Sequence, residues 1–544
     1  MLSLTSCGGQ HPGAAFDSRG WLADYLALRG HLSVAYANLR TARDQGLDLY
    51  ELDARTRKRI AAARDDREAL WALAAFVGAF GDGHLRIDFD DRAKSAPRYS
   101  FRLTDDGTAL RLSSLEPSDC AFAPGDAILR INGEPAAEYV KRYEAVATAH
   151  DPWLRHEAAM RLMVKGAYAP THYRLEGIHA GAATVCAFEP REAPQPNLSK
   201  SGTPDAICSQ LGYADKARGQ TLQLEGLAGF EPLVSDNPFS VGILTKRTGE
   251  HVAILRIPAF GEDQYYSTCV HVVAGLIGAA RSDDFADQVN RQVNTELTAA
   301  IAERIAAIEA RGIRELLVDV TGNGGGSGWA ERIARMLSTT ALACPDIGMV
   351  KHEHWQRRVE HDLANLRAEL AGEQLTARER EVVTARASRL ARVVGPLREV
   401  CDLTALWTTR HAAPPCQNVV RTPSLSCVAD LETPPPNAFR GHVTILVDRY
   451  SASATEQFVA ALKDYGNATV AGQLTYGVGC GYTAGGIAVA LPHSGLTVRA
   501  PDCVRFRGDG SNEALGIKPD LAIDWAVGDT PSQHTAKALQ ALGF

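Results

Sequence analysis

Several features that would place the 544-residue chain in particular protein classes are missing from it. No run of 18 or more apolar residues occurs, so no segment is long enough to cross a membrane as a helix. None of the 11 cysteines forms a Cys-x-x-Cys pair, which argues against a structural zinc site. Basic residues are not in excess, because the net charge is −7. We therefore expect no metal site, no nucleic-acid partner and no strongly basic surface for anionic membranes.

The first residues, MLSLTSCGGQ, lack the charged leader and the full apolar stretch of a signal peptide. Leu4, Thr5, Ser6 and Cys7, followed by two glycines, nevertheless resemble the lipobox of bacterial lipoproteins, in which the cysteine is lipidated. This resemblance implies an exported protein that is periplasmic or anchored to the membrane through Cys7. The alternative is an irregular small-residue terminus on a cytoplasmic protein.

The cysteines allow two interpretations that depend on the compartment. If Cys7 carries a lipid, ten cysteines remain, an even number, and in an exported protein some of them would form disulfides. Cys401 with Cys416 and Cys480 with Cys503 are two candidate pairs. Buried free thiols in a reducing compartment are the alternative.

The length predicts three or four domains at roughly 150 residues each. Apolar residues at three- and four-residue spacing predict helices over residues 17–80, and alternation around Asp105-Asp106-Gly107 predicts a β-hairpin. The predicted organisation has seven parts: a flexible terminus at 1–16 with the lipobox-like residues, an N-terminal helical domain at 17–90, a module at 91–180, a linker with irregular strands at 181–250, an α/β core at 251–345 and 437–528, a helical insertion at 346–436, and a C-terminal tail at 529–544.

Within the module, the segment APGDAILRINGEPAAEYVKRY begins at Ala123. It combines a turn, a short apolar strand, an Asn-Gly turn and a helix. This order resembles a PDZ domain, although the carboxylate-binding loop of PDZ domains is not evident. The resemblance implies a degenerate PDZ-like module.

Three hydroxyl residues, Ser451, Ser453 and Thr455, alternate with alanine between a predicted buried strand and a predicted helix. A serine at a helix N-terminus has free backbone N–H groups and the positive end of the helix dipole beside it. The same N–H groups can stabilise an oxyanion. The pattern therefore has two explanations, a helix cap or a nucleophile.

Two further segments belong with this one. A predicted buried strand leads into Asp319-Val320-Thr321-Gly322-Asn323 and then three glycines. Glycines let the backbone approach a ligand closely, and their N–H groups can face an anion. No Lys-Ser or Lys-Thr follows, so a nucleotide P-loop is not expected, and a tight turn is the alternative. The segment SNEALGIKPD, at 511–520, predicts by itself only a turn and a strand.

In this order the three segments resemble motifs of the tail-specific, or C-terminal processing, serine peptidases and of the tricorn core peptidases. Those motifs read D-x-R-x-N-x-G-G, S-A-S-A-S-E and G-x-x-P-D. The resemblance implies an α/β multidomain fold with a crotonase-like (ClpP-type) α/β peptidase core, an N-terminal helical bundle and a PDZ-like module. It also implies a serine endopeptidase that hydrolyses peptide or protein substrates through an acyl-enzyme, without metal or organic cofactor. The insertion would extend the substrate cleft or build an oligomer contact.

Residue by residue, Ser453 matches the nucleophile of the family. The N–H groups of Ala454 and Gly325 match the oxyanion donors. Thr321 is a departure, because the family usually has Arg at this position, and we expect a change in the local ion pairing.

The assignment of the general base rests on a second departure from the family motifs. The processing peptidases use a Lys 25 residues after the serine, and this chain has Val478 there, so the Ser–Lys dyad is absent. The tricorn-like branch uses a His from the N-terminal region and a Glu in the tail motif, which His84 and Glu513 match. A His near its unperturbed pKa of about 6.5 suits general-base catalysis. Glu513 would orient the His84 ring directly or through another group, although Gly83 replaces the Ser that precedes this His in tricorn relatives.

Two other functions remain open at this point. One is a catalytically inactive peptide-binding protein of the same fold. The other is an esterase or amidase with the same catalytic site.

Overall fold

The computed structural model describes most of the chain. Its residues are 16–88, 99–164, 168–191, 203–215, 222–234, 238–276, 285–340, 342, 344–372, 375–424, 439–483, 485–526 and 528–544. The lipobox-like residues around Cys7 lie outside them. Among the helices in these ranges, none has the length and apolar character that a membrane crossing requires.

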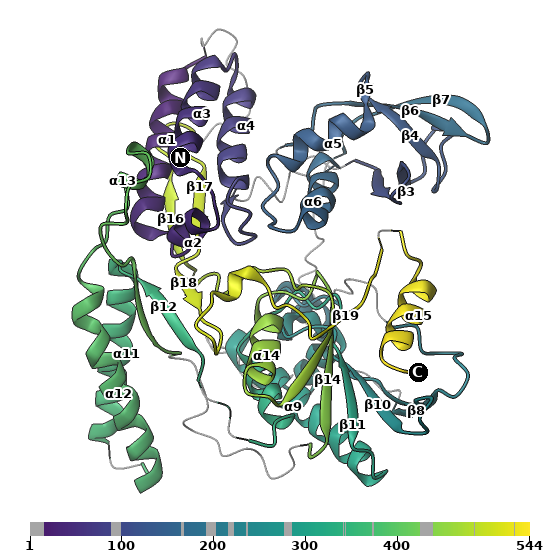
Figure 1. Cartoon of the computed structure of the whole chain (residues 1–544), viewed down its shortest axis with the longest axis vertical. Helices are drawn as coiled ribbons and strands as arrows, with labels where there is room; N and C mark the ends of the chain where they lie inside the picture. Colours follow the sequence, from purple (N-terminus) through teal and green to yellow (C-terminus); the bar gives the residue numbers. More distant parts are fainter. Residues whose placement is uncertain are drawn as a thin grey trace.

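A seven-stranded sheet, in the order β19-β15-β14-β11-β10-β9-β8, forms the centre of the lower half of the molecule in Figure 1. The strands from β19 to β10 are parallel to one another, and β9 and β8 continue the sheet with antiparallel pairing. Their bounds are β8 (Glu231–Val234), β9 (Val241–Thr245), β10 (His251–Arg256), β11 (Glu315–Asp319), β14 (His442–Val447), β15 (Ala468–Gly472) and β19 (Leu521–Ala522).

Helices cover both faces of this sheet, because successive side chains of a strand point to opposite sides. In β11, Leu316 and Val318 face the larger helical layer, and Leu317 faces the side on which Ala538 of the C-terminal helix packs. The larger layer contains α7 (Pro204–Gln210), η2 (Glu262–Gln264), α8 (Tyr266–Leu276), α9 (Phe285–Ala310), α10 (Trp329–Met336) and α14 (Ala454–Lys463), and the other face carries α15 (Pro531–Ala541). The long helix α9 precedes β11, and Gly312 follows its end with φ 71°.

The N-terminal helices share one hydrophobic core with strands from both ends of the chain. Figure 1 shows β16 and β17 of the C-terminal half beside the purple N-terminal helices. Strand β17 pairs antiparallel with β1, with Arg499 opposite Arg86, so this pairing anchors the segment that carries His84. The elements are α1 (Ser18–Ala35), α2 (Leu39–Asp44), α3 (Leu49–Ala62), α4 (Asp66–Gly78), β1 (Arg86–Asp88), β16 (Ile487–Ala490) and β17 (Thr497–Ala500).

The middle module consists of an antiparallel sheet, β2-β3-β4-β6-β7, with β5 paired to β4, and two helices. The predicted hairpin is confirmed, because β2 and β3 pair on either side of Asp106 and Gly107. The sheet continues to Phe188, beyond the predicted limit at residue 180. The elements are β2 (Phe101–Asp105), β3 (Leu110–Leu115), β4 (Ala127–Ile131), β5 (Glu134–Pro135), α5 (Ala136–Glu144), α6 (Pro152–Val164), β6 (Tyr173–His179) and β7 (Ala182–Phe188).

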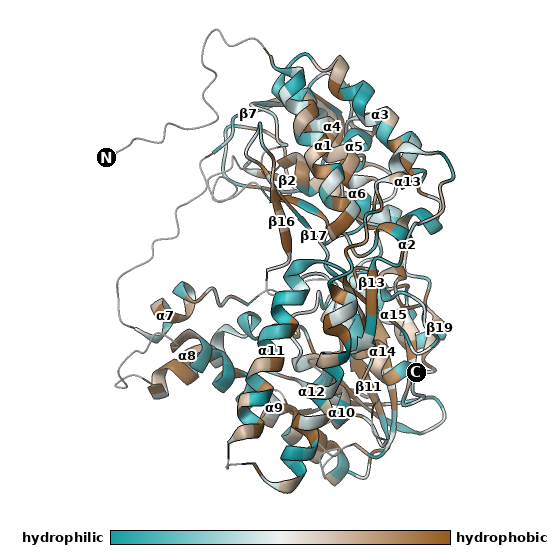
Figure 2. Cartoon of the chain, turned by 90° about the vertical axis from the view of Figure 1, so that its left-hand side faces the viewer, coloured by the Kyte–Doolittle hydropathy of each residue, from teal (hydrophilic) through white to brown (hydrophobic). Residues whose placement is uncertain are grey.

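The range 346–436, predicted as a helical insertion, contains both helices and strands in its described part, which ends at residue 424. Strand β12 (Asp346–Val350) pairs with β13 (Val419–Pro423) and with β18 (Cys503–Arg505), and these short strands carry too few residues for a local pattern. Between them α11 (Glu353–Ala371) and α12 (Ala377–Leu397) form a helical hairpin, followed by α13 (Ala405–Thr408). A capping box of Thr376 and Glu379 begins α12. Figure 2 shows hydrophilic residues along the outer side of α11, while Trp355, Val359 and Leu363 are buried.

Four disulfides join described residues: Cys120–Cys186, Cys208–Cys269, Cys401–Cys416 and Cys480–Cys503. Both candidate pairs from the sequence are therefore confirmed. The Cys480–Cys503 bridge ties the loop that follows β15 to strand β18.

Candidate active site

The three alternating hydroxyls serve different purposes. Ser451 Oγ donates to the carbonyl of Val320 at 3.0 Å, and Thr455 Oγ1 donates to the carbonyl of Asn323 at 2.9 Å. Both side chains are fully buried and tie the turn to the glycine-rich loop. Ser453 alone of the three lines a cavity of about 990 Å³.

The backbone at Ser453 adopts φ 57° and ψ −115°, a conformation that non-glycine residues rarely take. Such a conformation persists where surrounding contacts hold it, and it is frequent at functional sites. The Ser453 N–H donates to Glu456 Oε2 at 2.9 Å, and the Ser453 carbonyl accepts from Arg505 Nη2 at 2.9 Å. Ser453 is thus the N-cap residue of α14 and at the same time a strained, cavity-lining serine.

The glycine-rich loop presses directly against this turn. A Cβ on Gly325, whose φ is 95°, would lie 2.6 Å from the Ala452 carbonyl oxygen and 2.8 Å from the Ala454 nitrogen, so only glycine fits. The Gly325 N–H donates to Asn323 Oδ1 at 3.0 Å. The Ala454 N–H makes no hydrogen bond within the described residues, which leaves it available to an oxyanion.

The replacement of the usual Arg by Thr321 is compensated from the neighbouring strand. Arg256 Nη1, at the end of β10, donates to Asp319 Oδ1 at 2.9 Å and to Thr321 Oγ1 at 3.2 Å. Thr321 Oγ1 donates in turn to Asp319 Oδ1 at 2.7 Å. In this chain the guanidinium beside Asp319 is therefore supplied by β10.

His84 lies between α4 and β1, and its ring is held by the loop that follows β15. Nδ1 donates to the carbonyl oxygen of Val478 at 2.9 Å, which leaves Nε2 as the nitrogen with a free lone pair. The His84 N–H donates to Asp82 Oδ1 at 2.9 Å. Burial lowers the pKa of His84, and the Asp82 charge opposes this effect. The ring is therefore neutral near pH 7 and able to accept a proton.

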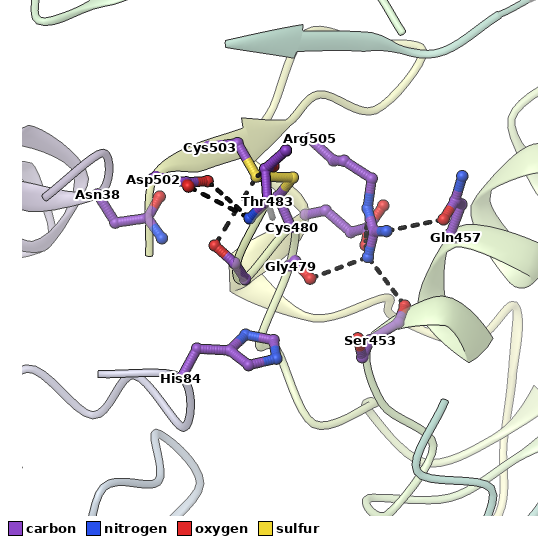
Figure 3. Close-up of a disulfide and its surroundings, with 12 residues drawn as sticks. Asn38, His84, Ser453, Gln457, Gly479, Cys480, Thr483, Asp502, Cys503 and Arg505 are labelled. Carbon is purple, nitrogen blue, oxygen red and sulfur yellow. Dashed lines mark hydrogen bonds and ion pairs between the residues drawn. A yellow bond between two sulfur atoms is a disulfide. The ribbon is translucent and has the colours of Figure 1, made fainter. Parts of the chain in front are cut away.

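His84 and Ser453 line the same cavity, which has a volume of about 990 Å³. The His84 ring extends toward the side of Ser453 in Figure 3. No hydrogen bond joins the two side chains in the described part of the chain. The other walls come from the tip of the β2–β3 hairpin, from helix α6 and from the C-terminal segment, where Trp525 and His534 stack.

The structure gives a steric reason for glycine immediately before His84. A Cβ on Gly83 would lie 2.8 Å from Val478 Cγ1 and 2.9 Å from Tyr476 Cε1. The residue that replaces the dyad lysine thus occupies the space that a serine side chain would need.

Glu513 is buried in a short 3-10 turn, η4 (Glu513–Leu515), and does not contact His84 among the described residues. Its Oε1 accepts a hydrogen bond from Arg505 Nε at 2.8 Å. Any influence of Glu513 on the His84 ring is therefore indirect.

Two residues of this site, Glu456 and Arg505, were not predicted from the sequence. The buried Glu456 carboxylate accepts from the Ser453 N–H, from Thr475 Oγ1 at 2.6 Å and from the Gly477 N–H at 2.7 Å. Burial, together with the charge of Glu513, raises the pKa of Glu456 to about 7. The Ser-x-x-Glu spacing of a capping box could have indicated Glu456, whereas no local pattern marks Arg505.

A family model described as peptidase family S41 matches residues 251–523, just over half of the chain. Two solved structures resemble the chain along nearly its whole length. Mature CPAF complexed with lactacystin has a TM-score of 0.67 at 15% identity, with 97% of this chain and 98% of that chain covered. A second structure, of mature CPAF, has a TM-score of 0.66 at 16% identity, with 96% of each chain covered. At this identity the likeness establishes a shared α/β multidomain fold.

Proposed function

Since the chain belongs to peptidase family S41 and is a serine-type peptidase, we propose that it is an endopeptidase of the C-terminal processing type with Ser453 as nucleophile and His84 as base. The observation that carries the proposal is the shared cavity. Ser453 and His84 are 369 positions apart in the sequence, yet both line one cavity, and the glycine-rich loop lies beside them.

The proposed reaction begins when Ser453 Oγ attacks the peptide carbonyl and His84 Nε2 takes the hydroxyl proton. The oxyanion binds to the Ala454 N–H, and the Gly325 N–H joins it by leaving Asn323 Oδ1. His84 then returns the proton to the leaving amine, and an acyl-enzyme forms on Ser453. A water molecule, deprotonated by His84, hydrolyses this ester in the second half of the reaction. The Val478 carbonyl keeps Nδ1–H bound throughout, which favours the imidazolium.

The wider architecture belongs to the same proposal. The parallel strands and their covering helices support a crotonase-like (ClpP-type) core at 251–345 and 437–528. The antiparallel sheet with α5 and α6 supports a PDZ-like module at 91–180, and α1 to α4 support an N-terminal helical bundle. Because the module lines the cavity with Asp105 and Trp153, it is placed to contact a peptide that enters the site.

The disulfides support an exported protein, because such bonds persist in oxidising compartments. Lipidation of Cys7 stays a prediction, and mass spectrometry of the mature N-terminus tests it.

The test of the nucleophile is covalent labelling with a fluorophosphonate probe. We expect labelling of the wild-type protein at Ser453 and none in Ser453→Ala. Peptide binding without labelling would favour the inactive peptide-binding alternative. Faster turnover of simple esters than of any peptide in a library would favour the esterase or amidase.

The test of the base is His84→Ala. We expect a loss of activity on the order of 1,000-fold or more with the fold retained, because the neutral serine then has no proton acceptor. The matched control is His361→Ala, an exposed histidine on α11 that does not line the cavity. Near wild-type activity of His84→Ala would overturn the assignment and move the search to His251, His271 or His493.

A further inference from the structure

Arg505, on strand β18, donates hydrogen bonds to four groups from three segments of the chain. Nε donates to Glu513 Oε1 and Nη1 to Gln457 Oε1, each at 2.8 Å. Nη2 donates to the carbonyl oxygens of Ser453 and Gly479, each at 2.9 Å (Figure 3). Because Arg505 is only 8% exposed, water does not replace these partners easily.

The bond to the Ser453 carbonyl also fixes the direction of the Ala454 N–H. These two groups belong to one planar trans peptide unit, in which C=O and N–H point to opposite sides. While Arg505 holds the carbonyl, the Ala454 N–H is turned away from the guanidinium. Glu456 holds the Ser453 N–H, so both peptide units next to the strained residue are fixed.

The bond to the Gly479 carbonyl connects Arg505 to the loop that holds His84, the proposed base. Gly479 follows Val478, whose carbonyl holds Nδ1 of His84. One guanidinium therefore contacts the peptide of the oxyanion donor and the loop that holds the base. An arginine suits this task, because its planar fork presents several donors in fixed directions, which a lysine ammonium does not.

Glu513 stabilises the buried guanidinium. Glu513 is 2% exposed and its Oε1 lies 2.8 Å from Arg505 Nε, so the two buried charges neutralise each other. The carboxylate does not reach the imidazole in the described structure, and Arg505 is the group through which it acts.

We propose that Arg505 is a positioning residue of the peptidase site: it sets the Ala454 N–H and the His84 loop in their working geometry, and Glu513 contributes by fixing Arg505. This proposal rests on the peptidase function proposed above. It predicts that Arg505 affects turnover and not substrate binding, since Arg505 does not line the main cavity.

The experiment compares Arg505→Ala with Arg507→Ala. Arg507 is a matched control, because it is a similarly buried arginine two positions away, with Nε donating to Asp464 Oδ2 at 2.8 Å, outside the site. We expect Arg505→Ala to lower kcat about 100-fold, the usual effect of a misplaced oxyanion donor, with KM changed less than about threefold. Arg507→Ala should keep kcat within about threefold of wild type.

Chemical rescue separates positioning from general stability. A second cavity, of about 440 Å³, is lined by Arg505, Gln457 and Cys480, so added guanidinium can reach the position that Arg505→Ala vacates. We expect millimolar guanidinium to restore kcat in Arg505→Ala and equimolar urea not to do so. If Arg505→Ala does not fold, Arg505→Lys retains the charge opposite Glu513, and its kcat, measured below its unfolding midpoint, should still fall.

A folded Arg505→Ala or Arg505→Lys with wild-type kcat would overturn the proposal, as would a loss that guanidinium leaves unrescued. These results differ from a failure of the peptidase function itself. In that case the wild-type protein would show neither fluorophosphonate labelling of Ser453 nor peptide cleavage.

Discussion

Replacing both cysteines of the Cys480–Cys503 bridge with alanine should reduce turnover far more than an equal loss of stability can explain. The bridge closes a loop with a sequence separation of 23, which by the chain-entropy relation corresponds to about 3.4 kcal/mol of stabilisation. The Cys401–Cys416 bridge has a separation of 15 and corresponds to about 3 kcal/mol. The two double variants are therefore expected to lose nearly the same free energy of unfolding.

Their positions relative to the site differ. Cys480 lies between Gly479, whose carbonyl is bound by Arg505, and Gly481, where a Cβ would come within 3.0 Å of His84 Nε2. The Cys401–Cys416 bridge instead belongs to the core of the N-terminal helices. Loss of the first bridge frees the loop that holds the His84 ring, and misplacement by about 1 Å can lower a rate by about 100-fold.

The assay combines thermal unfolding with peptide hydrolysis, normalised to the amount of folded protein. We expect kcat of the Cys480→Ala, Cys503→Ala variant to fall by about 10- to 100-fold. The Cys401→Ala, Cys416→Ala variant should keep its kcat at a temperature where both are folded. Equal kcat values for the two folded variants would refute the argument that the bridge positions His84.

Further predictions concern the glycine loop, the base and the C-terminal helix. Gly325→Ala should abolish activity, because the new Cβ would lie 2.6 Å from a backbone oxygen. Gly328→Ala is the control and should be active, because no atom lies within 4 Å of its Cβ position. Activity in both variants would contradict the close packing at Gly325. Burial lowers the pKa of His84 from 6.5, so the acid limb of kcat/KM should lie below pH 6.5. The Asp82 charge opposes this shift, so Asp82→Asn should move the acid limb lower still. An upward shift of the limb in Asp82→Asn would contradict the assignment of His84 as base. Burial lowers the pKa of His534 to about 4, so on acidification the unfolded chain takes up a proton at this histidine before the folded chain does. Stability should therefore fall by about 3 kcal/mol as the pH drops from about 6.5 to about 4, and denaturant titrations of His534→Gln should show a smaller loss.

The regular elements of the core could be predicted because their signals are local. The helix that became α9 has apolar residues at helical spacing over many turns, and the strand before the glycine loop is continuously apolar. Ser453 and His84 were found through motif resemblance, and the shared cavity is consistent with both. The short strands β12 and β13 could not be predicted, because their pairing depends on partners that are distant in sequence.

The contacts of Glu513 show the same limit at the level of side chains. The motif suggested an acidic residue near the base, yet a motif does not say which group the carboxylate touches. Arg505, eight positions earlier, reaches Glu513 because a strand and a 3-10 turn fold against each other. Position in a tertiary fold decides such a contact, and a window of sequence does not contain it.

The antiparallel pairing of β1 with β17 has a consequence for biosynthesis. On the proposed assignment, a nascent chain carries its imidazole early but receives the serine, and the strand that anchors the imidazole, only when most of the polypeptide has left the ribosome. An unfinished chain that lacks the serine or the anchoring strand is therefore expected to be inactive. Two fragments divided between residues 424 and 439 would each be inert, and their reassociation would restore hydrolysis.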